Sequence, residues 1–169
     1  MLSNTKESLE KFRRFVAQQS RSRLSKAGKN DSKGLYKKLD GVLKVSPNSF
    51  QLSWDLGYGE FIDKGVSGTK KKYNTPYSYK DKMPPIKPLA DWAKRKAIRL
   101  RDDKGRFQKG NYKTIGFLIA RSIQKKGLKP SLFFTKPFEQ GFKKLPDELL
   151  EAYGLDVEEF LKYTLKQQR

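Results

Sequence analysis

The sequence TIGFLIARSIQKKGLKPSLFFTKPF, Thr114 to Phe138, carries the strongest fold signals of the chain. A mostly apolar stripe at helical spacing predicts a helix, with members Ile115, Leu118, Ile119, Ser122 and Ile123. Gly127 ends this helix because glycine accepts the left-handed conformation, and Pro130 makes the exit extended. Three apolar residues follow at 132–134. We therefore expect a core helix, a sharp turn and buried aromatic rings.

Upstream, two segments predict a β-hairpin. From Leu35 to Val45, most apolar residues lie at odd-numbered positions, so they share one face of a strand. From Phe50 to Leu56, apolar and polar residues alternate. Residues 46–49 predict a turn with Pro47 at its second position. The chain thus predicts an α+β fold, in which a small antiparallel sheet built on a β-hairpin packs against several amphipathic helices and long basic loops extend outward.

An amphipathic helix is expected before the hairpin. Asn4 and Glu7 resemble a capping box, and an apolar face runs from Leu9 through Phe12 to Val16. Composition then turns to Ser, Lys, Asn and Gly, so the helix is expected to fray near Gln19 and a linker to follow. Residues 1–33 are therefore interpreted as an N-terminal helix and linker.

Residues 34–145 are interpreted as an α+β core domain. After the hairpin we expect one helical turn ended by Gly65, and then a basic insertion loop at 66–87. Pro88 predicts the first position of a helix that reaches Leu100. A second basic loop covers 101–113, with a turn at 102–105, and a helix is expected from Phe138 to Lys144.

The last section, 146–169, is expected to be helical and acidic. It carries six Asp or Glu residues before the first basic residue, Lys162. The middle of the chain has the opposite charge: between Lys64 and Lys129 there are 20 Lys or Arg against 4 Asp, so 16 of the 20 net positive charges lie there. A basic middle favours a polyanion or an acidic protein as neighbour, and the two signs together suit head-to-tail contact between copies.

Residues that combine positive charge with aromatic rings are the candidates for an interface. Such residues could stack on bases and neutralise phosphates, or form a protein-binding arm. The sequence leaves both interpretations open. The candidates are Lys70, Lys71, Lys72, Tyr73, Tyr77, Tyr79, Arg106, Phe107 and Lys109.

Several classes of chemistry are disfavoured. The chain has no Cys and no His, which excludes disulfides and catalysis by thiolate or imidazole. Asp55, Glu60 and Asp63 lie close in sequence, but ion pairs explain them better than a metal site. The segment GRFQKG at 105–110 lacks the residues of a phosphate-binding loop. We therefore expect no enzyme activity and no cofactor. No apolar run approaches about 18 residues, so a soluble chain without membrane contact is expected.

The order of these segments resembles the phage head-tail joining and tail-completion family typified by the HK97 virion neck protein. The similar motifs are YGEFIDKG at 58–65 with SGT at 67–69, and KPSLFFTKPFEQGF at 129–142. Between them, the segments at 84–98 and 115–130 resemble an insertion found in many virion proteins of this kind. The resemblance covers roughly Gly34 to Lys144, and the chain departs from it in its basic loops and acidic end.

This resemblance implies a structural role in a tailed bacteriophage. Members form a ring, of roughly six or twelve copies related by cyclic symmetry, in the neck, the head-tail connector or the tail-completion region. The expected partners are portal, connector or tail proteins of the virion, with non-specific contact to passing DNA. The alternative is a basic nucleic-acid-binding protein that compacts DNA or assists recombination, which explains the +20 charge more directly.

Overall fold

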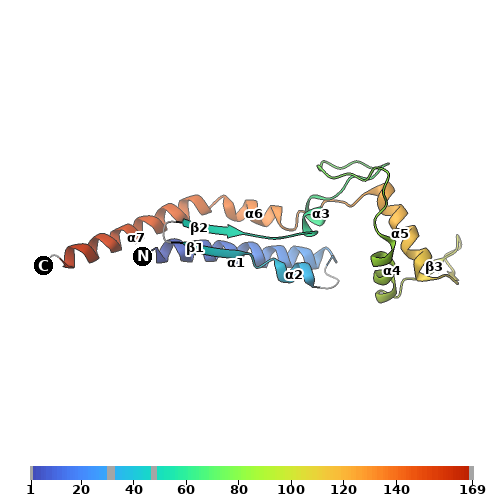
Figure 1. Ribbon diagram of the computed structural model, residues 1–169, viewed down its shortest axis with the longest axis horizontal. Coiled ribbons are helices and arrows are strands. Elements are labelled where there is room, and N and C mark those ends of the chain that lie inside the picture. Colours follow the sequence, from blue (N-terminus) through green and yellow to red (C-terminus); the bar gives the residue numbers. More distant parts are fainter. Residues whose placement is uncertain (1, 30–32, 47–48, 168–169) are drawn as a thin grey trace. The chain divides into compact units, whose positions relative to one another are not determined.

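The chain divides into two compact units (Figure 1). The computed structural model describes residues 2–29, 33–46 and 49–167. Unit 1 comprises Met1–Gly59 and Ser131–Arg169, and unit 2 comprises Glu60–Pro130. Helices together with two antiparallel two-stranded sheets in these described residues confirm the predicted α+β fold.

The division differs from the three consecutive sections expected, 1–33, 34–145 and 146–169. The chain leaves unit 1 after Gly59 and returns at Ser131, so the first and last sections share one unit with the hairpin. The basic middle forms the other unit. The reason is that the apolar faces of the two terminal helices are buried against each other and the hairpin, which sequence distance does not reveal.

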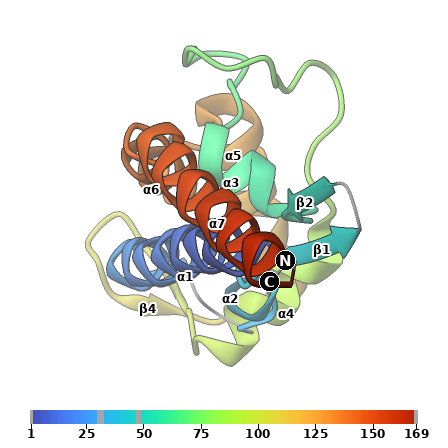
Figure 2. The same cartoon turned by 90° about the vertical axis from the view of Figure 1, so that its left-hand side faces the viewer.

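Unit 1 is built from two long helices, two short ones and one hairpin. Its elements are α1 (Ser3–Lys26), α2 (Gly34–Lys38), β1 (Val42–Ser46), β2 (Ser49–Ser53), α6 (Thr135–Phe142) and α7 (Leu145–Gln167). The buried core residues are Leu9, Phe12, Val16 and Leu145, and partly buried side chains from the hairpin, α6 and α7 pack around them. Figure 2 shows α1 and α7 lying against each other, which their residue contacts confirm.

Aromatic rings join α1, the hairpin and α6. Phe12 contacts Trp54 edge-on at 6.1 Å between ring centroids and Phe138 at 5.5 Å. Trp54 contacts Phe134 at 5.5 Å, and Phe133 beside it is fully buried. Edge-to-face pairs at these distances add to the free energy gained from burial. The predicted burial of the aromatic rings at 133–134 is thus confirmed, and Trp54 and Phe138 both connect Phe134 to α1.

The hairpin is confirmed in part. β1 and β2 pair antiparallel with Leu43 opposite Leu52 and Val45 opposite Phe50. Residues 35–38 were expected to be strand but form α2, because Leu35 and Leu39 are both buried at the four-residue spacing of a helix. The expected turn at Pro47 lies outside the described residues.

Two expectations about α1 are wrong. The helix does not fray near Gln19 but continues to Lys26, because Ser20 and Leu24 are fully buried on its inner face. The proposed capping box also fails: Leu2 is the cap residue and makes no side-chain cap bond. Asn4 lies inside the helix and bonds to α7 instead.

Unit 2 is built around a helix pair. Its elements are α3 (Gly59–Lys64), which begins at the last residue of unit 1, α4 (Ile86–Arg95), β3 (Leu100–Arg101), β4 (Phe107–Gln108) and α5 (Tyr112–Lys126). α4 packs on α5 where Gly116 faces it. A Cβ at Gly116 would lie 2.9 Å from the Ala90 nitrogen and the Ile86 oxygen, so glycine is what allows the close approach.

The helix predicted from Thr114 is confirmed, with a different buried face. Ile115, Gly116 and Ala120 are buried, whereas Leu118 is 46% exposed and Ser122 is exposed. The prediction missed Gly116 and Ala120 as core positions because it considered only large apolar side chains. Small residues reach the core in another way, since they let the backbones of two helices approach closely. Gly127 ends α5 as predicted, with a positive φ of 73°, but its ψ of −170° is extended rather than that of the expected left-handed cap.

The prediction for α4, a helix from Pro88 to Leu100, is wrong at both ends. Pro88 is the third residue of α4 rather than the first, and α4 ends at Arg95. Leu100 belongs to β3, and its partner is Gln108. The basic segment 101–113 therefore contains a short hairpin rather than loop alone, since Leu100 and Arg101 pair across the turn that the sequence did predict.

Candidate interaction surfaces

The basic loop that follows α3 is fixed against the end of α5. The backbone N–H groups of Thr69 and Lys70 donate to the carbonyl oxygens of Gln124 and Lys125, both at 2.9 Å. These carbonyls belong to the last turn of a helix, where such acceptors are otherwise unpaired. The side chains of Lys70, Lys71 and Lys72 are exposed. The loop therefore presents three cations from a backbone held at defined positions.

The tyrosines of this loop serve partly to hold it. The Tyr73 and Tyr79 N–H groups donate to the Ser67 hydroxyl at 3.0 Å and the Ser67 carbonyl at 2.8 Å. Burial raises the pKa of the Tyr79 phenol. The Tyr77 ring packs edge-on against Phe61 at 4.7 Å. Tyr73, Tyr77 and Tyr79 are all half-buried, so the lysines form the outer surface of the loop and the tyrosines its inner support.

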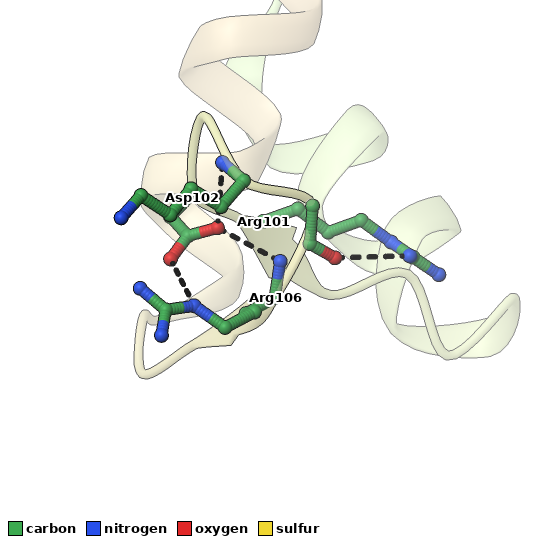
Figure 3. A network of polar contacts seen from close by, with 5 residues as sticks. Arg101, Asp102 and Arg106 are labelled. Carbon is green, nitrogen blue, oxygen red and sulfur yellow. Dashed lines mark hydrogen bonds and ion pairs between the residues drawn. The ribbon is translucent and has the colours of Figure 1, made fainter.

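The turn of the β3–β4 hairpin is organised by one aspartate (Figure 3). One oxygen of the Asp102 carboxylate accepts hydrogen bonds from the Lys104 N–H at 3.0 Å and the Arg106 N–H at 2.8 Å. Its other oxygen accepts from Arg106 Nε at 3.1 Å. Arg101 closes the turn by donating to the Gly105 carbonyl at 3.1 Å. The hairpin thus fixes the backbone of a strongly basic tip.

Phe107 is the exposed aromatic residue of this hairpin, 63% accessible. The guanidinium groups of Arg99 and Arg101 lie over its ring, 5.6 and 4.6 Å from the centroid. Arg106 and Lys109 are exposed beside it. The candidate list contained Arg106, Phe107 and Lys109 but omitted the two arginines. The pairing of Arg101 with Phe107 across the hairpin would have indicated one of them, had the strands been recognised.

The candidate residues form two groups rather than one site. The lysine loop contacts the C-terminal end of α5, and the β3–β4 hairpin directly precedes its N-terminal end. α5 has 15 residues, a length of about 22 Å. A ligand that contacts both groups must therefore be an extended one.

The ion-pair interpretation of the acidic residues is confirmed for two of the three. Asp55 pairs with Lys38 at 3.5 Å, and Glu60 pairs with Lys64 at 2.7 Å. The hydrogen bond from Lys64 lowers the pKa of Glu60 and raises that of Lys64. Asp63 is buried rather than on the surface. Within the described parts of the chain, no group of three or more Asp or Glu residues is placed to hold a metal ion.

Asp156 joins the two terminal helices of the chain. In the sequence it counted only as one of the six acidic residues of the last section. Asp156 on α7 is 2% exposed and accepts hydrogen bonds from the N–H groups of Asn4 at 3.0 Å and Thr5 at 2.9 Å. The Thr5 hydroxyl also donates to it at 2.7 Å. Burial alone raises the pKa of Asp156, but the bonds from Thr5 and Asn4 outweigh it and hold that pKa below its usual value. Asp156 thus caps α1 from another helix.

α7 carries a second apolar face, outside the core. Its inner face buries Leu145, Ala152 and Asp156. About a quarter turn around the helix lies what we call the α7 stripe, whose members are alternately three and four residues apart. Leu150 is 72% exposed, Tyr153 55%, Val157 38% and Phe160 44%. The stripe comprises Leu150, Tyr153, Val157, Phe160 and Thr164.

No family model, curated protein or solved structure matches this chain. Among the residues that the structure describes, no helix is long and apolar enough to cross a membrane.

A groove of about 750 Å³ also lies between α1, α6 and α7 in unit 1. Phe12, Phe15 and Leu155 line its apolar part, and Glu7 and Glu148 lie among its polar residues. Glu7 is already paired with Lys11 at 3.0 Å. The lining also holds Lys144 and Glu151, so the groove mixes apolar side chains with three acids and two lysines.

Proposed function

We propose that the chain is a structural subunit of a tailed-bacteriophage virion, which forms a ring in the neck, the head-tail connector or the tail-completion region. The observation that carries the proposal is the α7 stripe. Apolar side chains exposed along one face of a helix are typical of a surface that another protein covers.

The charge distribution supports assembly between copies. Unit 2 holds 20 Lys or Arg and 6 Asp or Glu, a net charge of +14. α7 holds 6 Asp or Glu and 2 Lys, a net charge of −4. Opposite charges on different parts of one chain favour heterologous contacts, which close into a ring when the rotation permits. The motifs at 58–65 and 129–142 supply the assignment to the phage neck family.

The proposal is tested by the mass and shape of the purified protein. We expect light scattering after size exclusion to give a discrete multiple of the 19.6 kDa chain, and electron microscopy of the same fraction to show rings. If the protein stays monomeric and also fails to bind co-expressed portal or tail proteins, the assembly role is excluded. High-salt runs serve as the control, since they remove aggregates held only by charge.

A second candidate is nucleic-acid binding, favoured by the exposed lysines at 70–72 and the arginines around Phe107. Each phosphate contact adds about 0.9 to the slope of log affinity against log salt. Replacing Lys70, Lys71 and Lys72 by Gln is then expected to reduce that slope by about 3 in retardation assays with random duplex DNA. Unchanged slope and affinity would exclude the loop as a DNA contact. Lys11, Lys37 and Lys44 replaced by Gln provide a control of equal charge in unit 1.

A further inference from the structure

One ridge of α5 combines positive charge with an aromatic ring. Residues four apart are neighbours on the surface of a helix, so they form a ridge along it. We define the α5 ridge as Lys113, Phe117, Arg121 and Lys125, which span about 18 Å of the helix. The first three are exposed and Lys125 is half-buried, whereas Gly116 is buried where α4 packs on the helix.

The charge of this ridge is not neutralised within unit 2. α5 contains no acidic residue. Among the residues that the structure describes, no carboxylate pairs with a cation of the ridge. From Arg99 to Lys126 there are nine Lys or Arg against two Asp, and one of these two, Asp102, is already held by Arg106 (Figure 3). The potential along this part of the chain therefore favours an extended polyanion.

Two exposed rings distinguish nucleic acid from other polyanions. Phe107 in the hairpin that precedes α5 is 63% exposed, and Phe117 on the ridge is 38% exposed. The Arg101 guanidinium lies 4.6 Å from the centroid of the Phe107 ring, so a ring and a planar cation lie together at the surface. Nucleobases stack on both kinds of group. An acidic peptide supplies charge but no regularly repeated planar rings to cover these side chains.

The same rings favour a single strand over a duplex. In a duplex the faces of the bases are covered by their neighbours, so an aromatic side chain reaches them only by unstacking a base step, at a cost in free energy. In a single strand the faces are open. The ridge spans about five nucleotides at the spacing of about 3.4 Å along one strand, within the range of about 4 to 16 nucleotides that single-strand-binding domains cover.

We propose that the α5 ridge, together with Phe107, binds single-stranded nucleic acid. Bases stack on Phe107 and Phe117, and phosphates pair with Arg121 and Lys125. At the end of the ridge the Lys70 N–H donates to the Lys125 carbonyl at 2.9 Å, so the lysine loop continues the path of cations. The inference rests on the second candidate function, nucleic-acid binding, and it does not depend on ring formation.

Fluorescence anisotropy with labelled oligonucleotides tests the proposal on the full-length protein. The probes are single strands of thymidine or of uridine nucleotides, about 20 long, and a random duplex of the same length. Phe107→Ala and Phe117→Ala are each expected to weaken single-strand binding by about 5- to 100-fold and to change duplex binding by less than about twofold. The thymidine and uridine strands show whether DNA or RNA binds more tightly.

Leucine variants separate loss of stacking from loss of folding. Phe107→Leu and Phe117→Leu keep an apolar side chain but remove the ring, so the fold is expected to persist while single-strand affinity falls as in the alanine variants. Circular dichroism and thermal unfolding check the fold. If the folded leucine variants keep the wild-type affinity, no base stacks on these rings and the proposal is overturned.

The phosphate contacts are tested by the dependence of affinity on salt. Arg121→Gln with Lys125→Gln is expected to reduce the slope of log affinity against log salt by about 1.4, because each phosphate contact on a single strand contributes about 0.7. Lys37→Gln with Lys44→Gln removes two exposed cations of unit 1, and Phe15→Ala removes a ring that is 40% exposed on α1. These controls are expected to bind as the wild type does.

Three further outcomes overturn the inference. A duplex that binds more tightly than either single strand, with no loss in the Phe107 and Phe117 variants, would retain nucleic-acid binding and exclude base stacking on the ridge. Equal competition by poly-glutamate would identify an acidic protein as the ligand. If the wild type binds neither single strands nor duplex, the second candidate function fails together with the inference, and the proposed virion role is unaffected.

Discussion

At the scale of single residues, Asp156 shows how one carboxylate fixes two chain ends. It supplies acceptors to the Asn4 and Thr5 N–H groups in the first turn of α1, where backbone donors have no partner within the helix. A negative charge at that position also interacts favourably with the helix dipole. The sequence offered a signal for this role, because Asp156 continues the buried spacing of Leu145, Leu149 and Ala152.

Replacing Asp156 by Asn is expected to lower the free energy of unfolding by about 1 to 3 kcal/mol, because charged hydrogen bonds to buried donors are lost. The change is measured by urea unfolding in high salt. Glu151→Gln, an exposed acid on the same helix, is the control and is expected to change stability by less than about 0.5 kcal/mol.

The contribution of Asp156 also depends on pH. Its folded-state pKa lies below the usual 3.8, so its stabilisation is fully present above that value and is lost as pH falls through the folded pKa. The stability difference between wild type and Asp156→Asn should therefore shrink on acidification below about pH 3.8. A difference that stays constant down to the acid unfolding limit would show that the charge of Asp156 is not what stabilises α1.

Two glycines within helices lead to opposite expectations. Gly116→Ala would place a Cβ 2.9 Å from backbone atoms of α4, so a loss of about 1 to 3 kcal/mol is expected in spite of the better helix propensity of alanine. Gly154→Ala in α7 has no atom within 4 Å, and a gain of about 0.5 to 1 kcal/mol is expected. Thermal unfolding of both variants checks the sign. Equal effects would mean that Gly116 does not limit the approach of α4.

At the scale of elements, α7 combines two functions along one helix. Its first half closes the core of unit 1 through Leu145 and Leu149, and its second half exposes Phe160 and Leu161. α7 therefore carries more apolar side chains than its contacts within the chain bury. In unit 2, α5 shows the same excess, since Phe117 and Leu118 lie opposite its buried face.

Ending the chain after Glu159 is expected to abolish self-association and to leave unit 1 folded. The truncation removes the exposed Phe160 and Leu161 and the half-buried Thr164, but keeps Asp156 with its bonds to α1. The free energy of unfolding should change by less than about 1 kcal/mol, because the removed side chains add little to the core. Light scattering gives the mass. Full assembly by the truncated chain would contradict a role of the last turns.

At the scale of the whole molecule, charge is divided between the parts of the chain. Unit 2 carries +14 and α7 carries −4, so contacts between these parts of different copies are attractive over a Debye length of about 8 Å at physiological salt. Self-association is therefore expected to weaken as salt rises from low to high, without disappearing, since the apolar contact remains. Sedimentation at several salt concentrations measures the shift. Association that strengthens with salt would indicate a contact made by apolar surface alone.

The sequence by itself determined the α+β class, the strands of the hairpin after Gly41, the helix ended by Gly127 and the buried rings near Phe133. These features depend on neighbours close in sequence: alternation, helical spacing, and the conformations of glycine and proline. The resemblance to a phage neck family also came from short local motifs, and it remains a proposal.

Tertiary structure alone decided the division into two units, the full length of α1, the cap by Asp156 and the exposed stripe on α7. Each depends on residues far apart in the chain, such as Thr5 and Asp156, whose contact no local pattern encodes. An apolar stripe on a helix predicts that the face is covered but not by what. The fold covers one face of α7 with α1 and leaves the α7 stripe exposed.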